Sequence, residues 1–131
     1  MKKTALLNIE LSELVASLGH HDMVVIGDAG LPVPSETWRI DLALTQGVPR
    51  FIETLRVLLS EMQVERVMVA EETERISPQI LAEIKDLLPG IPIEFTTHAL
   101  LKEATHQARA VVRTGEFTPY ANIILFAGVV F

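Results

Sequence analysis

Groups that can transfer protons lie at both ends of one short apolar segment near the N-terminus. His20 and His21 precede the run from Met23 to Ile26, and Asp28 follows it. The run is rich in β-branched residues, which predicts a buried strand with imidazoles at its start and a carboxylate at its end. Imidazole titrates near neutral pH, so a positioned ring can give or take a proton in hydroxyl chemistry. A histidine at a helix end also binds the last helix carbonyls, and the sequence alone favours that structural role for His20.

The loop after this strand has the features of a ligand-binding loop. Asp28 begins the sequence Asp-Ala-Gly-Leu-Pro-Val-Pro. Its two prolines fix φ and remove backbone donors, while Gly30 permits close approach or a positive φ. Ligands bind at the carboxyl ends of strands in open α/β sheets, and Asp28 occupies such a position. An Asx-type turn cap is the alternative role for its carboxylate.

Further polar residues lie at the starts of predicted elements in the last third of the chain. His98 follows Thr97 at a predicted helix start, where the helix dipole disfavours a cationic ring and predicts a neutral imidazole. Tyr120 and Asn122 enter the final strand two positions apart, so we expect them on one face, with donors and acceptors for several hydroxyl groups. Purely structural roles compete at all three positions. His106 has no comparable context and is interpreted as a surface residue.

Other reaction classes lack their residues in this chain. There is no cysteine, which excludes disulfides and thiolate nucleophiles, and no serine lies in a nucleophile elbow. The glycines around Asp28 do not form a phosphate-binding loop, and the four histidines are not at metal-ligand spacing. The acidic run from Glu71 to Glu74 is typical of a solvated surface. Either the chain transfers protons without a cofactor or a metal ion, or it does no chemistry.

The rest of the sequence predicts alternating helices and strands. We expect helices over 11–18, 51–62, 78–88 and around His98, and strands over 23–26, 40–44, 64–70, 91–96, 110–112 and 123–131. Asn8 caps the first helix and Gly19 stops it. This order predicts a single layered α/β domain over residues 1–131, a mixed β-sheet covered by helices on both faces. The apolar C-terminal run must form a buried strand or a subunit contact, because exposed it would be an aggregation edge.

Composition narrows the possible partners and the location. The chain has 131 residues, 49% of them hydrophobic, and a formal net charge of -6 with 11 scattered basic residues. Nucleic-acid binding needs clustered Lys and Arg and is not expected. No apolar run is long enough to span a membrane, and the start is too short in its apolar part for a signal peptide, which predicts a cytoplasmic protein. So many apolar residues in so small a chain predict a homo-oligomer with apolar surface between its subunits.

Several motifs occur in a fixed order over nearly the whole chain. They are His20, Asp-Ala-Gly-Leu-Pro-Val-Pro from Asp28, Arg39-Ile40-Asp41, Gln46-Gly47-Val48-Pro49, and the run from Arg113-Thr114-Gly115 to Tyr120-Ala121-Asn122. In order and spacing they resemble the ribose pyranase and fucose mutarotase family of sugar-isomerising proteins. The resemblance implies interconversion of the pyranose and furanose forms of D-ribose or a related monosaccharide, without a cofactor, in ring-shaped homo-oligomers.

The resemblance also implies a role for each candidate residue. The catalytic proton donor is expected to be His20. The substrate ligands are expected to be Asp28, His98, Tyr120 and Asn122. His98 is in addition the best candidate for the group that helps to remove the anomeric hydroxyl proton. The neighbouring His21 is expected to face solvent or a subunit contact.

Two alternative functions stay open at this point. The first is a mutarotase for another aldose such as fucose, which Gly30 disfavours because the fucose branch of the family carries a bulkier residue there. The second is a non-catalytic sugar-binding module. Such a module would use Asp28, Tyr120 and Asn122 but would have no need of His20.

The spacing of His20 and Asp28 conflicts with one small pocket in one chain. Asp28 follows His20 by eight positions. An extended strand advances about 3.3 Å per residue, so the two side chains are expected roughly 20 Å apart. Either the turn before Met23 and Gly27 shorten this path, or a neighbouring subunit completes the pocket. We expect the second, an interfacial active site, because it also explains the apolar surplus.

Overall fold

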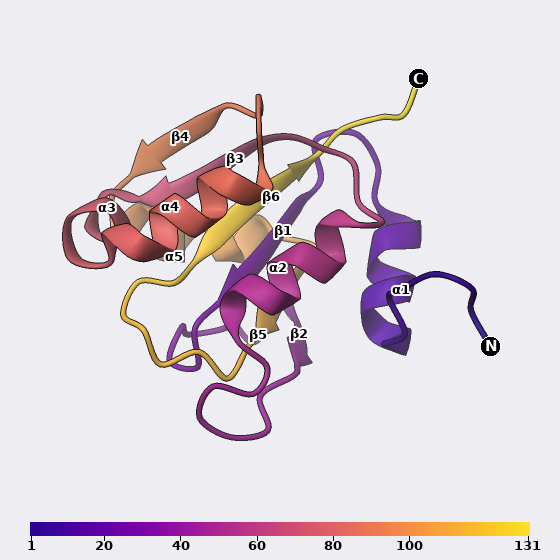
Figure 1. Cartoon of the computed structure of the whole chain (residues 1–131), viewed down its shortest axis with the longest axis horizontal. Helices are drawn as coiled ribbons and strands as arrows, with labels where there is room; N and C mark the ends of the chain where they lie inside the picture. The colour runs from indigo at the N-terminus through magenta and orange to yellow at the C-terminus, as the bar shows by residue number, and fades with distance from the viewer.

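Six short segments pair into one mixed sheet in the computed structural model, which describes all residues, 1–131 (Figure 1). The strands are β1 (Met23–Gly27), β2 (Trp38–Asp41), β3 (Val64–Ala70), β4 (Ile93–Thr96), β5 (Ala110–Arg113) and β6 (Ile123–Ala127). The helices are α1 (Ile9–Ser17), α2 (Phe51–Leu59), α3 (Glu71–Ile76), α4 (Pro78–Leu87), α5 (His98–Ala104) and the short 3-10 helix η1 (Thr105–Gln107). The strand order is β2-β5-β1-β6-β3-β4.

The direction of the strands determines which loops meet. β1 is parallel to β5 and antiparallel to β6, while β2 is parallel to β5 and β3 is antiparallel to β6 and parallel to β4. Only β6 therefore runs against the others. The last residues of β1 to β5 and the first residue of β6 lie at one end of the sheet, called here the carboxyl end. The start of β1 and the last residue of β6 lie at the opposite, amino end.

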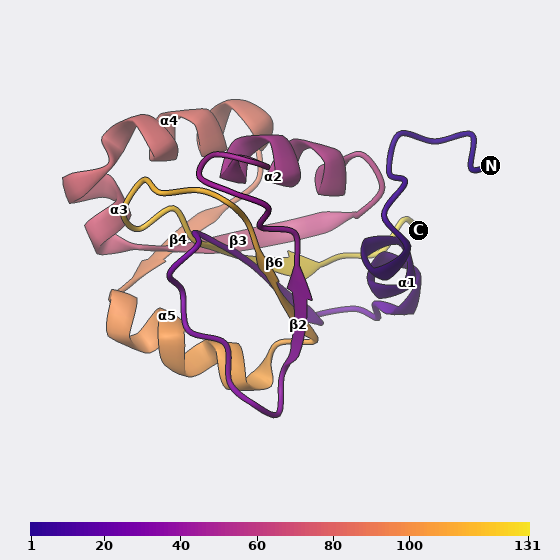
Figure 2. The same ribbon diagram turned by 90° about the horizontal axis from the view of Figure 1, so that it is seen from below.

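Side chains that alternate along the strands form two apolar cores. Val24 and Ile26 of β1 face the larger core, which α1, α2 and α4 cover, and the intervening Val25 faces the smaller core with Leu101 of α5. Figure 2 shows α2 and α4 on one side of the sheet and α5 on the other. The expected mixed sheet with helices on both faces is confirmed.

The first helix places the turn that carries His20. Asn8 caps α1 as expected, because its Oδ1 accepts a hydrogen bond from the Leu11 amide at 2.9 Å. The helix ends at Ser17, with Leu18 rather than Gly19 at the C-cap. The Gly19 amide then donates to Asp22 Oδ2 at 2.8 Å, which closes a tight turn just before β1.

The strand predicted over 40–44 lies earlier in the chain, at Trp38–Asp41. It pairs with β5 from Trp38 opposite Ala110 to Asp41 opposite Arg113, where β5 also ends. Asp41 Oδ1 accepts a hydrogen bond from the Ala43 amide at 3.0 Å, and this Asx turn leads the chain away from the sheet. The alternation of apolar residues up to Leu44 was therefore misleading, and Leu44 is exposed.

The acidic segment after β3 is helix α3, not a solvated surface run alone. Glu71 and Glu74 are exposed and Glu72 is half-buried, whereas Thr73 is fully buried and the following Ser77 nearly so. The sequence of this short helix has no apolar periodicity, because its buried side chains are polar.

The C-terminal apolar run is only partly strand. β6 ends at Ala127, opposite Val64, the first residue of β3, so no strand remains to pair with the tail. Val130 and Phe131 are exposed at the surface. None of the helices has the length and apolar character that crossing a membrane requires.

Candidate active site

Two loops far apart in the sequence meet at the carboxyl end of the sheet and join Asp28 to Asn122. The Asp28 amide donates to Asn122 Oδ1 at 2.9 Å, and Asn122 is fully buried. Gly27 permits this approach, because a Cβ there would lie 3.0 Å from Asn122 Oδ1 and 2.6 Å from the Leu31 side chain. Asp28 Oδ1 also accepts from the Gly30 amide at 2.9 Å, so the carboxylate has the Asx-turn role and lies beside Asn122.

The Asp28 carboxyl is poorly solvated. Burial raises the pKa of Asp28 above its ordinary value of 3.8, although the Gly30 amide, the nearby Asn122 amide and the His98 ring lower it. A carboxylate in such a place gains from any further hydrogen-bond donor, such as a hydroxyl group of a ligand. A raised pKa among specific polar partners is typical of functional sites.

His98 is the first residue of α5 and joins the same group. The Leu100 amide donates to Thr97 Oγ1 at 3.2 Å, and the His98 amide donates to Glu72 Oε2 at 2.9 Å, so the start of this helix is well capped. Burial and the nearby Lys102 lower the pKa of His98 below its ordinary 6.5. Its ring is therefore neutral at pH 7, which agrees with the prediction from the helix start.

Tyr120 lies against His98, with ring centroids 5.0 Å apart and the rings edge to face. Its backbone is left-handed, with φ of 60°, and the Asn122 amide donates to the Tyr120 carbonyl at 2.9 Å. Because β6 begins only at Ile123, the expectation that Tyr120 and Asn122 share a strand face is wrong. A tight turn, rather than strand alternation, brings them to the site.

Asp28, His98, Tyr120 and Asn122 are called here the carboxyl-end site, and it contains polar atoms without partners. Asn122 Nδ2 and His98 Nδ1 are both buried and make no hydrogen bond. Leaving a buried polar group unpaired costs about 1–3 kcal/mol, so folded proteins rarely do so without a functional reason. The site can accept a ligand with several hydroxyl groups.

The hollow at this end is not closed around the four residues. A cavity of about 420 Å³ lies beside Asp28, and Gly30, Arg113 and the segment Glu116 to Pro119 line it. His98, Tyr120 and Asn122 do not line this cavity. In a single chain, therefore, no one cavity is lined by all four residues of the carboxyl-end site.

The remaining motifs support the Asp28 loop. Arg113 donates from Nε to the Ala29 carbonyl at 3.0 Å and from Nη1 to Asp41 Oδ2 at 3.0 Å. The Ala29 amide donates to the Glu116 carbonyl at 2.8 Å, and the buried Glu116 carboxylate accepts from the Thr118 hydroxyl at 3.0 Å. These bonds hold the loops after β1 and β5 together at the rim of the cavity.

Two buried hydroxyl groups that sequence reasoning missed hold the Tyr120 turn. Thr73 Oγ1 donates to the Tyr120 carbonyl at 2.8 Å, and Ser77 Oγ donates to the Pro119 carbonyl at 2.6 Å. Both hydroxyl groups come from α3 and the residue after it. Their spacing of one helical turn, within an otherwise acidic segment, is the signal that could have indicated them.

His20 does not join the carboxyl-end site. It lies at the amino end, in the turn before β1, where the His21 amide donates to the Ala127 carbonyl and the Ala127 amide to the Asp22 carbonyl, both at 2.9 Å. The whole length of β1 separates this turn from Asp28. Within one chain the predicted proton donor and the predicted substrate ligands are at opposite ends of the sheet.

At the amino end two imidazoles share one carboxylate. His20 Nε2 lies 2.8 Å from Glu65 Oε2 and His21 Nδ1 lies 2.6 Å from Glu65 Oε1, and the two rings stack with centroids 3.6 Å apart. The hydrogen bonds from the two histidines lower the pKa of Glu65. One ligand atom from each residue lies within 4.8 Å of the others, so this trio is the group that could hold a metal ion. His21 is exposed, as expected, but faces Glu65.

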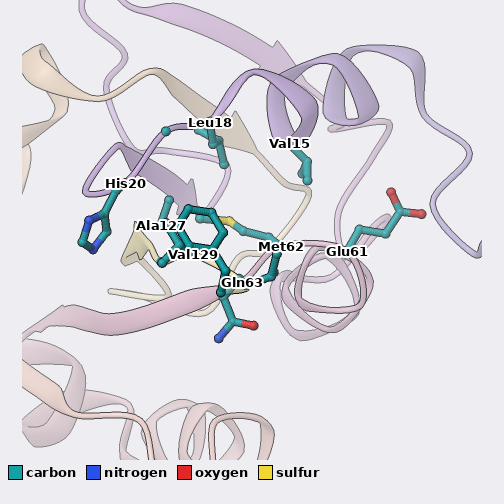
Figure 3. A pocket seen from close by; sticks show the side chains of 12 residues that line it. Val15, Leu18, His20, Glu61, Met62, Gln63, Ala127 and Val129 are labelled. Atoms are coloured by element: carbon teal, nitrogen blue, oxygen red, sulfur yellow. The ribbon is translucent and has the colours of Figure 1, made fainter.

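An apolar hollow of about 490 Å³ lies beside His20. Val15 and Leu18 of the first helix segment, Met62 and the C-terminal tail from Ala127 to Phe131 line it together with His20. Figure 3 shows His20 at one end of this hollow, with Ala127 and Val129 next to it. The fourth histidine, His106, is a surface residue paired with Glu36, as expected.

Known proteins resemble this chain over its full length. Residues 1–130 match the protein family described as the RbsD / FucU transport protein family. A D-ribose pyranase of Chloroflexus aggregans is 64% identical over 131 residues and one of Clostridium perfringens is 56% identical, each over 100% of both chains.

Two solved structures also match this chain over nearly its whole length. The structure of Bacillus subtilis RbsD complexed with D-ribose matches 100% of both chains with a TM-score of 0.97 and 47% sequence identity. The fucose mutarotase from Streptococcus pneumoniae in complex with L-fucose covers 95% of this chain and 94% of its own, with a TM-score of 0.80 and 26% identity. The chain belongs to the RbsD / FucU transport protein family.

Proposed function

We propose that this protein is a D-ribose pyranase, which interconverts the pyranose and furanose forms of D-ribose without a cofactor. The observation that carries the proposal is the pair of unpaired buried nitrogen atoms, His98 Nδ1 and Asn122 Nδ2, beside the Asp28 carboxyl. In a member of this family these atoms are suited to the hydroxyl groups of a pentose. The full-length similarity to D-ribose pyranases supports D-ribose as the substrate.

The reaction consists of proton transfers and one carbon–oxygen bond exchange. Ring opening breaks the bond between the anomeric carbon and the ring oxygen, which gains a proton, while the anomeric hydroxyl loses its proton and becomes the aldehyde oxygen. Reclosure reverses these transfers with a different hydroxyl group as the attacking oxygen. One acid and one base are sufficient, and nothing is oxidised or reduced.

The acid in this mechanism is His20, which protonates the ring oxygen. The base is His98, whose neutral ring carries an unpaired Nδ1 for the anomeric hydroxyl proton. Asp28, Tyr120 and Asn122 bind the other hydroxyl groups. Acid/base assistance of this kind accelerates a reaction by about 10²–10⁴-fold, which is enough for a ring opening that already proceeds in water.

We further propose that the protein forms a ring-shaped homo-oligomer with active sites between subunits. A single sugar cannot reach from the amino end to the carboxyl end of the sheet, so His20 of one subunit must serve the carboxyl-end site of its neighbour. The apolar hollow beside His20 and the exposed Val130 and Phe131 supply surface for that contact. The neighbour would also close the open side of the carboxyl-end site.

Exchange NMR on D-ribose tests the proposal, because it measures the rate at which pyranose and furanose signals interconvert. Wild-type protein should accelerate exchange, and His20→Ala should remove the acceleration while ribose still binds. His106→Ala is the matched control, since its ring pairs with Glu36 at the surface, and should exchange as wild type does. Undiminished exchange in His20→Ala would refute the acid role.

The same assay separates the two alternatives. A mutarotase for fucose would exchange L-fucose faster than D-ribose, although the fucose mutarotase structure is less similar to this chain than RbsD is. A non-catalytic sugar-binding module would bind ribose without exchange in the wild type. The cytoplasmic location stays a prediction, which fractionation of cells that produce the protein would check.

A further inference from the structure

We infer that Glu65 is a positioning residue that fixes the His20 ring so that Nδ1, and not Nε2, delivers the proton to the sugar. The inference rests on the proposed role of His20 and adds a residue to it. It follows from a local defect in β3, from the room made for that defect and from the hydrogen bonds that result.

The defect is a β-bulge at Glu65. Val64 pairs with Ala127 and Arg66 with Phe126, so two steps along β3 match one step along β6 and Glu65 is the extra residue. Regular alternation back from Val67 would place residue 65 on the side of the larger core. With the bulge, Val64 takes that core position instead. The Glu65 carboxylate is thereby free to reach the turn that carries His20.

Gly128 makes room for the bulge. Its amide donates to the Gln63 carbonyl at 2.9 Å, which keeps the tail after β6 close to β3. A Cβ at position 128 would lie only 3.2 Å from the Glu65 Cβ. A side chain there would be in tight contact with Glu65, which would have to shift slightly, so a glycine at position 128 leaves the bulge undisturbed.

The hydrogen bond determines which ring atom of His20 faces a substrate. A carboxylate only accepts, so Nε2 of His20 must carry its hydrogen to make the 2.8 Å bond to Glu65 Oε2. Nδ1 then holds the proton that the cationic ring gives away, and it becomes the acceptor in the neutral ring. The proton moves from Nδ1 to the sugar ring oxygen, and the bond from Nε2 to Glu65 persists throughout.

His21 fixes the carboxylate in turn. Its left-handed backbone, with φ of 71°, brings Nδ1 to 2.6 Å from Glu65 Oε1 and stacks its ring on His20. Both carboxylate oxygens are thus used, and the His20 ring, which is still 46% exposed, is held from two sides. A carboxylate also orients the imidazole in Ser-His-Asp enzymes, although there it binds Nδ1 and leaves Nε2 to react.

Glu65→Gln tests this role, because an amide has only one acceptor oxygen and cannot accept from the ring N–H groups of both histidines. We expect kcat for ribose exchange to fall about 10-fold or more, as part of the acid/base contribution is lost, with KM unchanged. Nitrogen-15 NMR of the His20 ring should show Nε2 protonated and Nδ1 free in the neutral wild type, and a mixture of tautomers in Glu65→Gln. Chelator in all samples removes any metal ion from the trio.

Glu94→Gln is the matched control, because Glu94 is an exposed glutamate on the adjacent strand β4 that pairs with Arg66. It should keep wild-type kcat, and equal melting temperatures would show that both variants fold. If His20→Ala is inactive but Glu65→Gln keeps wild-type kcat and the His20 tautomer, the inference is wrong and the proposed function stands. If His20→Ala is fully active, both are wrong.

Discussion

At the scale of single residues, the carboxyl-end site depends on polar groups that folding leaves short of partners. Asn122 Nδ2 and His98 Nδ1 are buried and unpaired, and the Asp28 carboxyl has lost part of its solvation. Residue type and position made all three candidates and predicted a neutral His98, whereas their roles as substrate ligands came only from the family resemblance. They could not predict that Gly27 lets Asn122 reach the Asp28 amide, because that contact joins segments far apart in the chain.

The Asp28→Asn variant should be more stable than the wild type at neutral pH and should lose ribose exchange. Because the folded-state pKa of Asp28 is raised, the folded protein keeps this proton over a pH range in which the unfolded chain has lost it. The free energy of unfolding therefore falls as pH rises through that range, and the ionised carboxylate is a net cost at pH 7. An asparagine removes the charge and can still accept from the Gly30 amide.

Thermal melting of both proteins across pH checks this expectation. The gain in melting temperature should shrink as pH falls and vanish only well below 3.8, where the wild-type carboxyl is neutral in both states. A variant less stable than the wild type at pH 7 would contradict the conclusion that the poorly solvated Asp28 carboxylate destabilises the folded protein.

Ribose binding should be insensitive to pH down to 6.5 and weaken only in more acidic solution. The lowered pKa of His98 means that its ring takes up a proton at a lower pH than a free histidine does. On acidification the unfolded chain binds that proton first, so the free energy of unfolding also falls below pH 6.5. Calorimetric titrations with ribose at several pH values measure the effect, with His98→Gln as a control that does not titrate. Affinity that already declines above pH 6.5 would contradict it.

At the scale of secondary-structure elements, the helices and strands with a clear apolar periodicity could be predicted, and the short helix α3 could not. The pattern in β3 predicts the strand correctly, since Val64, Val67 and Val69 face the core. The bulge within it has no sequence signal, because it depends on pairing with β6. Helix α3 was missed because it buries hydroxyl groups rather than apolar ones. Those hydroxyl groups determine where the Tyr120 turn lies.

Thr73→Val should loosen the Tyr120 turn. The change keeps the shape of the side chain but removes the hydrogen bond to the Tyr120 carbonyl, which is then left without this partner. Because the Tyr120 carbonyl still accepts from the Asn122 amide, we expect the free energy of unfolding to drop by about 0.5–1.5 kcal/mol and ribose affinity to fall. Denaturant unfolding and calorimetry measure the two effects. The matched control is Thr37→Val, whose buried hydroxyl donates to the Thr105 carbonyl instead of that of Tyr120. Unchanged ribose affinity in Thr73→Val would show that the turn needs no such support.

At the scale of the whole molecule, the sheet separates the proposed proton donor from the proposed substrate ligands. Spacing in the sequence was enough to predict this, because a strand of known rise lies between His20 and Asp28. The neighbour that completes the site could not be placed from the sequence, since the surfaces involved come from both ends of the chain. Ribose exchange is therefore expected only in the oligomer, where His20 of one subunit meets Asp28 of another.

Co-expression of two inactive variants tests that claim most directly. His20→Ala keeps the carboxyl-end site and Asp28→Asn keeps the proton donor, so a mixed oligomer contains interfaces at which both wild-type residues meet. With random assortment at equal amounts, about a quarter of the sites are complete, and exchange NMR should recover about a quarter of wild-type activity. Distinct affinity tags on the two variants verify that mixed oligomers form. Mixed oligomers that stay inactive would contradict a site shared between subunits.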